Sequence, residues 1–328
     1  MAQTGQIPRK QFGKTGVQIS ALGLGGHHLG GAEDQKTADR IVSRAIDGGV
    51  NFFDNCWEYH RGKSEDWMGA ALKGKRQQVF LMTKVCTHGR EKAIALRMLE
   101  QSLRRLQTDH LDLWQIHGAS FDNDAELFIR PNGAAEALTQ AKKEGKVRFV
   151  GFTGHKDPKI HLAMLKTGFP FDAAQMPLNP FDATFRSFET QVLPELNRRG
   201  IAPLGMKPLS GAGPAIKAGV LSAEESLRYA MSLPVATTIT GMEKMDVVEQ
   251  NLKIAQGFEP LEQQEMNALR DRCRRYADGR YETYKVSLKY DNPEARLAHD
   301  FPLDMQSKEV KEMMKATENN GKPWPSVK

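Results

Sequence analysis

The chain has 328 residues, enough for one large α/β domain or two ordinary domains with a sizeable buried core. Its 46 basic and 40 acidic residues give a formal net charge of +6, but no block of Lys and Arg resembles a nucleic-acid-binding arm or a membrane-surface helix. No stretch approaches the roughly 20 apolar residues of a membrane span. We therefore expect a small-molecule partner, and neither nucleic acid nor a membrane.

The three cysteines, Cys56, Cys86 and Cys273, show neither the spacing of a metal site nor that of a disulfide framework. Residues 1–20 lack the cationic start and apolar run of a secretion signal. We expect a reduced, cytoplasmic location and no metal. Cys56 and Cys86 lie within three residues of predicted strand ends, and we interpret them as small thiols that line the core.

Short apolar segments recur roughly every 30 residues, which is the length of one strand-plus-helix unit. Between them lie amphipathic stretches that predict helices at 92–106, 134–143 and 222–231. The apolar segments predict eight strands, at residues 19–24, 50–53, 79–83, 111–116, 147–152, 171–176, 201–206 and 235–240.

Strands that are apolar throughout and alternate with helices indicate a parallel sheet covered by helices. Eight such units predict an α/β fold of the (β/α)8 TIM barrel type. A doubly wound open sheet is the alternative, because periodicity alone does not show closure. Residues 207–214 are rich in Gly and Pro and predict a loop over the barrel mouth.

The alternation of strands and helices stops beyond residue 257. Residues 261–276 predict one more helix, and residues 277–328 are polar with scattered prolines. We therefore divide the chain into a barrel of residues 1–260 and a C-terminal helix and extended tail, residues 261–328, packed on it. Because a polar tail buries little apolar area, we expect it to affect substrate handling or assembly more than barrel stability.

Four polar residues lie at or shortly after the ends of predicted strands: Asp54, Tyr59, Lys84 and His117. The carboxyl ends of the strands are where parallel α/β barrels gather their chemistry. Pairing with Asp54 would keep Lys84 from being a lone buried charge, and the ammonium is expected to lower the pKa of Tyr59. Such a tyrosine suits proton transfer to a developing alkoxide, with His117 orienting the same oxygen. Hydride would come from a cofactor, since no side chain supplies one.

These residues resemble the aldo-keto reductase signature, in which an Asp and a Tyr flank a turn of small residues before a Ser-Glu helix start. Lys84 and His117 fall on the family's other two catalytic positions. The resemblance extends from about residue 9 to about residue 256, and it is carried by residues 51–59, 62–65 and 68–72, with similar stretches at 9–16, 23–26 and 200–209.

The resemblance implies a nicotinamide cofactor that lies extended across the barrel mouth, without a GxGxxG unit. Thr153 and Gly154 take the places of a serine and an asparagine that usually hold the carboxamide, and Gln175 matches the family's glutamine. Gly154 offers no amide, so one contact is expected to be lost or supplied by His155. Met206 stands where an aromatic ring usually stacks on the nicotinamide, and its thioether can pack there more loosely.

The resemblance also implies where the cofactor phosphates bind. The loop after the seventh strand offers backbone N–H groups and a hydroxyl to the pyrophosphate. At the adenosine end Lys244 is the only nearby cation, Glu243 opposes it, and Val247 replaces a basic or polar residue. We expect Lys244 to face inward and to give NADPH a modest preference over NADH. The implied cofactor-binding residues are Gly26, Thr153, Gly154, Gln175, Met206, Lys207, Leu209, Ser210, Gly211, Gly241, Glu243, Lys244, Gln250 and Asn251.

The resulting prediction is an NAD(P)H-dependent enzyme that reduces an aldehyde or ketone, with Tyr59 as the general acid. One alternative is a cofactor-binding redox sensor similar to the family's potassium-channel beta subunits, and another is a Schiff-base barrel that uses Lys84 or Lys207. Several histidines after strand ends hint at a polar mouth and a hydroxylated, sugar-like substrate, although solvated loop histidines explain them equally well. The oligomeric state is left open.

Overall fold

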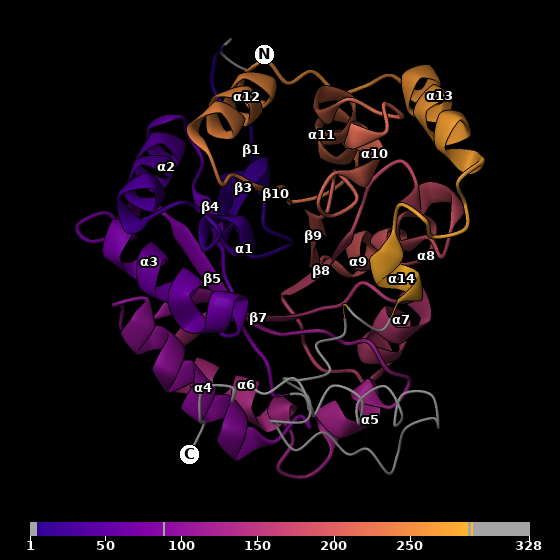
Figure 1. Cartoon of the computed structure of the whole chain (residues 1–328). Helices are drawn as coiled ribbons and strands as arrows, with labels where there is room; N and C mark the ends of the chain where they lie inside the picture. The colour runs from indigo at the N-terminus through magenta and orange to yellow at the C-terminus, as the bar shows by residue number, and fades with distance from the viewer. Residues whose placement is uncertain (1–4, 88, 288–289, 291–328) are drawn as a thin grey trace, which may run out of the picture.

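The computed structural model describes residues 5–87, 89–287 and 290, and it contains a closed barrel of eight parallel strands in the order β10-β3-β4-β5-β6-β7-β8-β9. Helices surround this barrel (Figure 1). The (β/α)8 prediction is confirmed, and the open sheet is excluded because β10 pairs with both β9 and β3. The barrel strands are β3 (Leu22–Gly25), β4 (Phe52–Asp54), β5 (Phe80–Val85), β6 (Leu111–Ile116), β7 (Val147–Thr153), β8 (Ala173–Pro177), β9 (Ala202–Met206) and β10 (Thr237–Gly241).

The first predicted strand, residues 19–24, is two strands in the structure. β2 (Gln18–Ser20) pairs antiparallel with β1 (Arg9–Gln11), and only β3 enters the barrel. Phe12, directly after β1, and Ile19, within β2, are fully buried in a cluster with Phe52 and Phe80 from the barrel interior. The hairpin therefore closes the end of the barrel where the strands begin.

The predicted helices are present with shifts of one or two residues at their ends. Ser222 starts α11 through a capping box with Glu225. The loop after β9 ends at Pro214, which begins the short helix α10; proline suits the first position of a helix because the missing N–H has no partner there. The helices of the described residues are α1 (Gly26–Leu29), α2 (Gln35–Asp47), α3 (Lys63–Ala71), α4 (Lys92–Arg105), α5 (Asp124–Ile129), α6 (Ala134–Lys143), α7 (Pro158–Lys166), α8 (Phe188–Gln191), α9 (Leu193–Arg199), α10 (Pro214–Lys217), α11 (Ala223–Ser232), α12 (Met245–Gln256), α13 (Gln263–Arg274) and α14 (Thr283–Val286), with 3-10 turns η1 (Tyr59–Gly62), η2 (Arg76–Gln78) and η3 (Asp182–Thr184).

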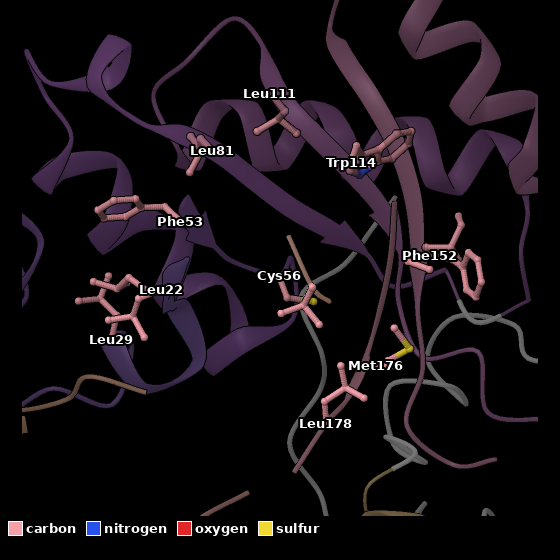
Figure 2. Packing of buried hydrophobic residues seen from close by; sticks show 14 of the residues in the cluster. Leu22, Leu29, Phe53, Cys56, Leu81, Leu111, Trp114, Phe152, Met176 and Leu178 are labelled. Carbon is pink, nitrogen blue, oxygen red and sulfur yellow. The ribbon is translucent and has the colours of Figure 1, made fainter. Parts of the chain in front are cut away.

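The larger core lies between the strands and the helix layer. Figure 2 shows Phe53, Leu81, Leu111 and Trp114 in this cluster, all of them fully buried. A second cluster fills the inside of the barrel. Barrel strands bury both faces, which explains why they are apolar throughout and do not alternate with polar residues.

The C-terminal segment enters the fold more deeply than its polar sequence suggests. α13 packs through Met266 and Leu269, and Lys285 in α14 is fully buried, with its Nζ 2.6 Å from the Asp182 carboxylate. The predicted extended tail lies outside the described residues from position 288 on, apart from Tyr290, so the division at residue 260 stays a prediction. Within the described parts of the chain, no helix is both long and apolar enough to cross a membrane.

Candidate active site

Asp54, Tyr59, Lys84 and His117 meet at the open end of the barrel. Asp54 ends β4, Lys84 is the next-to-last residue of β5, and His117 directly follows β6. Tyr59 begins the 3-10 turn η1, five residues after Asp54. Parallel strands in register bring these positions to one rim although up to 63 residues separate them in sequence.

Lys84 connects the carboxylate to the phenol. Its Nζ lies 2.5 Å from Asp54 Oδ1, donates to the backbone oxygen of Asn55 at 2.8 Å and donates to Tyr59 Oη at 3.3 Å. The ammonium and the carboxylate are 1% and 4% exposed. A cation with three acceptors in this dry position holds a hydrogen-bond donor against the phenolic oxygen.

The pKa of Tyr59 moves in the opposite direction to the one predicted. Burial raises it well above 10, and the negative charges of Asp54, Cys56 and Glu58 add to that effect. The sequence argument weighed the effect of the Lys84 ammonium on the phenol, but neither the burial of the phenol nor the effect of the Asp54 carboxylate on it. The phenol of Tyr59 is therefore held in its protonated form.

Two glutamines that face the barrel interior extend this network. Gln175 Nε2 donates to Asp54 Oδ2 at 2.8 Å, and its Oε1 accepts from Gln115 Nε2 at 2.9 Å. Gln175 was predicted to hold the cofactor carboxamide; in this structure its amide nitrogen orients Asp54. Gln115 was missed, because a single polar residue in an apolar strand carries no sequence signal of its own.

His117 is surrounded by polar groups. Its Nδ1 lies 2.7 Å from Glu58 Oε1, 3.4 Å from Cys86 Sγ and 3.5 Å from Cys56 Sγ. Burial lowers the pKa of His117, but the neighbouring Cys56 and Glu58 outweigh it and raise the pKa to about 9. Burial raises the pKa of Cys56, while hydrogen bonding with Cys86 and the charge of His117 bring it to about 7.

Arg90 holds the backbone behind His117. Its guanidinium donates to the His117 and Gly118 carbonyl oxygens at 2.8 and 3.0 Å and pairs with Asp124, both partners being fully buried. Arg90 has a positive φ of 63°, a conformation that a non-glycine residue adopts only when its surroundings impose it. Sequence reasoning missed Arg90, because a loop arginine gives no sign of where it points.

Three histidines and a lysine line the mouth near Tyr59. The rings of His27 and Tyr59 are 5.2 Å apart, and His60 and His28 lie within 5.5 Å of the His27 ring. Although part of His27 is exposed, desolvation of its ring lowers its pKa to about 4, and the charges of the neighbouring histidines add to the effect. Burial, reinforced by the charge of Lys84, lowers the pKa of Lys207 to about 8. The expected polar mouth is present.

The predicted carboxamide site is more crowded than the sequence suggests. A Cβ at Gly154 would lie 2.4 Å from the Ala119 carbonyl oxygen and 2.8 Å from the ring of His161. The family's asparagine therefore has no room here. Thr153 Oγ1 accepts from the Gly118 N–H at 3.3 Å, and His155 is buried against the ring of Tyr284.

The loop after β9 has the backbone shape of an anion-binding turn. Lys207, Ser210, Gly211 and Gly213 all have φ between 54° and 86°. Successive turns of this kind aim backbone N–H groups to one side. Met206 ends β9 with its Sδ 3.6 Å from Gln175 Nε2, at the position expected to contact the nicotinamide.

The residues implied at the adenosine end lie around the start of α12. Glu243 is half-buried and its charge acts on His28, whereas Lys244 is exposed at the N-cap of α12. Asn251 is buried and donates to the Gly241 carbonyl oxygen at 3.1 Å, while Gln250 is exposed. That Lys244 faces the cofactor stays a prediction.

Two of the residues that the family resemblance implies for cofactor binding have a packing role. A Cβ at Gly26 would lie 2.5 Å from the Asp54 carbonyl oxygen, so glycine lets α1 approach β4 closely. Leu209 is partly buried against the main core.

This barrel, with its site at the carboxyl ends of the strands, is the architecture of the aldo-keto reductases. The model of the aldo/keto reductase family matches residues 21–215, so the chain belongs to this family of NAD(P)H-dependent oxidoreductases. An uncharacterized oxidoreductase, YqkF of Bacillus subtilis, is 28% identical over 303 residues, 80% of this chain and 95% of its own. L-galactose dehydrogenase of Arabidopsis thaliana is 27% identical and covers 78% of this chain and 90% of its own.

A solved structure shares the fold. Aldo-keto reductase AKR11C1 from Bacillus halodurans, in its holo form, superimposes with a TM-score of 0.70 over 84% of this chain and all of its own, at 24% identity.

Proposed function

We propose that this enzyme reduces an aldehyde or ketone with NADPH and that Tyr59 donates the proton. The observation that carries the proposal is the contact of one buried ammonium, Lys84 Nζ, with both Asp54 Oδ1 and Tyr59 Oη. The cofactor would supply hydride to the carbonyl carbon, and Tyr59 would protonate the oxygen. As the proton leaves, Lys84 stabilises the phenolate through the bond that it already donates.

The geometry favours reduction over alcohol oxidation. A phenol whose pKa is raised well above 10 stays protonated over the whole physiological range, so the phenolate that alcohol oxidation would need as a base is scarce. His117 would orient the carbonyl oxygen through Nε2, because Nδ1 faces Glu58 and the two thiols. Met206 and the turn at Lys207, Ser210 and Gly211 would hold the nicotinamide and the pyrophosphate.

The substrate proposed is a hydroxylated, sugar-like carbonyl compound. His27, His28 and Lys207 place polar groups at the mouth, and an apolar substrate that displaced their water would leave these groups without hydrogen bonds. The name of the relative L-galactose dehydrogenase fits this class. A Schiff base at Lys84 is disfavoured because its ammonium is ion-paired with Asp54.

Tyr59→Phe tests the assignment. We expect turnover, followed at the nicotinamide absorbance, to fall by at least about 100-fold, because general acid catalysis typically contributes roughly 10²–10⁴-fold. The Kd for NADPH should hardly change, since only a proton donor is lost. The control is Tyr290→Phe, a tyrosine that is 45% exposed. Retention of more than a hundredth of the parent turnover would mean that Tyr59 is not the main acid.

A further inference from the structure

Four side chains from three strand ends converge beside the catalytic rim. Cys56 and Glu58 follow β4, Cys86 follows β5 and His117 follows β6. Their potential ligand atoms, two Sγ, one carboxylate oxygen and one imidazole nitrogen, all lie within 4.8 Å of one another. Both cysteines are fully buried, and Figure 2 shows Cys56 among the apolar residues of the core.

One ring nitrogen of His117 lies at the centre of this cluster. His117 Nδ1 has Glu58 Oε1 at 2.7 Å, Cys86 Sγ at 3.4 Å and Cys56 Sγ at 3.5 Å, yet one ring nitrogen carries either one hydrogen or one lone pair. The His117 Nδ1 can therefore form a good hydrogen bond with one of these three neighbours at a time. A cation between the four groups would contact all of them at once.

We propose that Cys56, Glu58, Cys86 and His117 form a binding site for one Zn²⁺ ion. Thiolate, imidazole and carboxylate are the ligands that zinc takes, usually four in a tetrahedron. Zinc bonds of about 2.3 Å to sulfur and about 2.05 Å to nitrogen give tetrahedral S···S and S···N separations of about 3.8 and 3.6 Å. The S···N distances here are 3.4 and 3.5 Å, and the S···S distance is 3.2 Å, so the thiolates need to move apart by about half an ångström. Glu58 Oε1 lies 2.7 Å from His117 Nδ1 and would have to move out to about 3.4 Å.

The supporting backbone is rigid. The Trp57 N–H donates to the Lys84 carbonyl oxygen at 3.1 Å and the His117 N–H to the Val85 carbonyl oxygen at 2.9 Å, which continues the barrel ladder into the site. Arg90 fixes the His117 carbonyl oxygen. Ligands on such fixed elements need little ordering when the ion binds.

Zinc at this position would set the tautomer of His117. With Nδ1 on the metal, Nε2 keeps its hydrogen and remains a permanent donor. The His117 and Tyr59 rings are 5.9 Å apart and perpendicular. The ion would thus position a substrate-orienting residue, and all four ligands would come from the protein, leaving no coordination position for substrate.

The test uses the full-length chain, reduced and stripped with a chelator. It is titrated with Zn²⁺ against a chromophoric chelator, and with Co²⁺ while the near-ultraviolet spectrum is recorded. We expect one zinc per chain and a thiolate-to-cobalt charge-transfer band. Cys56→Ser and Cys86→Ser should each weaken zinc binding by roughly 100-fold or more. Cys273→Ser, which alters the third buried thiol, on α13, should leave both readouts unchanged.

Several results would overturn the site: no stoichiometric zinc uptake by the reduced chain, a cobalt spectrum without the thiolate band, or uptake that survives both substitutions. A reduced chain that takes up no zinc but forms a Cys56–Cys86 disulfide under mild oxidation would identify a redox pair instead. Should a serine variant fail to fold, the cobalt spectrum of the unmutated chain decides, because it needs no substitution.

Discussion

Removing the ammonium of Lys84 should lower both the stability and the turnover of the enzyme. Removing the Asp54 carboxylate as well should restore the stability but not the turnover, so the double variant distinguishes the two effects. Lys84→Met leaves the Asp54 carboxylate, 4% exposed, with Gln175 as its remaining side-chain donor among the contacts described above. Breaking one partner of a buried ion pair costs roughly 3–5 kcal/mol, because the remaining charge stays in a poor solvent. Asp54→Asn combined with Lys84→Met removes both charges and should recover most of that loss.

The expected loss in melting temperature follows from the chain length. Unfolding entropy is about 2.1 cal/mol/K per residue near 60 °C, so a 328-residue chain should lose about 4–7 °C in Tm for a loss of 3–5 kcal/mol. The double variant should melt within about 2 °C of the parent. Both variants should turn over at least about 100-fold more slowly, because the donor to Tyr59 Oη is absent in each.

The assay combines thermal unfolding, followed by circular dichroism at one scan rate, with turnover followed at the nicotinamide absorbance. Equal destabilisation of the single and double variants would show that Asp54 is not left as an uncompensated charge. Recovery of activity in the double variant would refute a catalytic role for the ammonium.

Three further outcomes are expected. Burial raises the pKa of Glu282 to about 7, so its contribution to stability is present below pH about 4.5 and is lost as the pH rises through about 7. The hydrogen-exchange protection of residues 279–287 should therefore fall between pH 5.5 and 8. Glu282→Gln should abolish this fall, and an equal fall in the variant would contradict the reasoning. Glu243→Ala should strengthen NADPH preference and Lys244→Ala should reverse it, measured as the ratio of the two cofactor Kd values; a tighter Kd for NADH in the unmutated protein would identify Glu243 as the selector. Gly154→Ala should destabilise by roughly 1–3 kcal/mol in urea unfolding, because its Cβ meets the Ala119 carbonyl oxygen, and an unchanged midpoint would refute the packing argument.

The sequence predicted the fold because a parallel barrel is locally encoded. Each strand buries both faces and each helix buries one, so the repeat of apolar runs and amphipathic stretches is visible without tertiary information. The rim positions of Asp54, Lys84 and His117 follow from the same repeat, since residues at strand ends share one edge. The local pattern did not predict the break at Ala21, where a single apolar run is divided between the hairpin strand β2 and the barrel strand β3.

Contacts between distant side chains were decided only by the tertiary structure. Burial and the paired carboxylate of Asp54 reverse the predicted direction of the Tyr59 pKa, and burial depends on packing from every side. Lys285 lies in a polar stretch, yet it is fully buried against Asp182, 103 residues away. Cys56 and Cys86 have no metal spacing in the sequence, but neighbouring strands bring their sulfurs to 3.2 Å. Local patterns determine which elements form, whereas the register between strands determines which side chains meet.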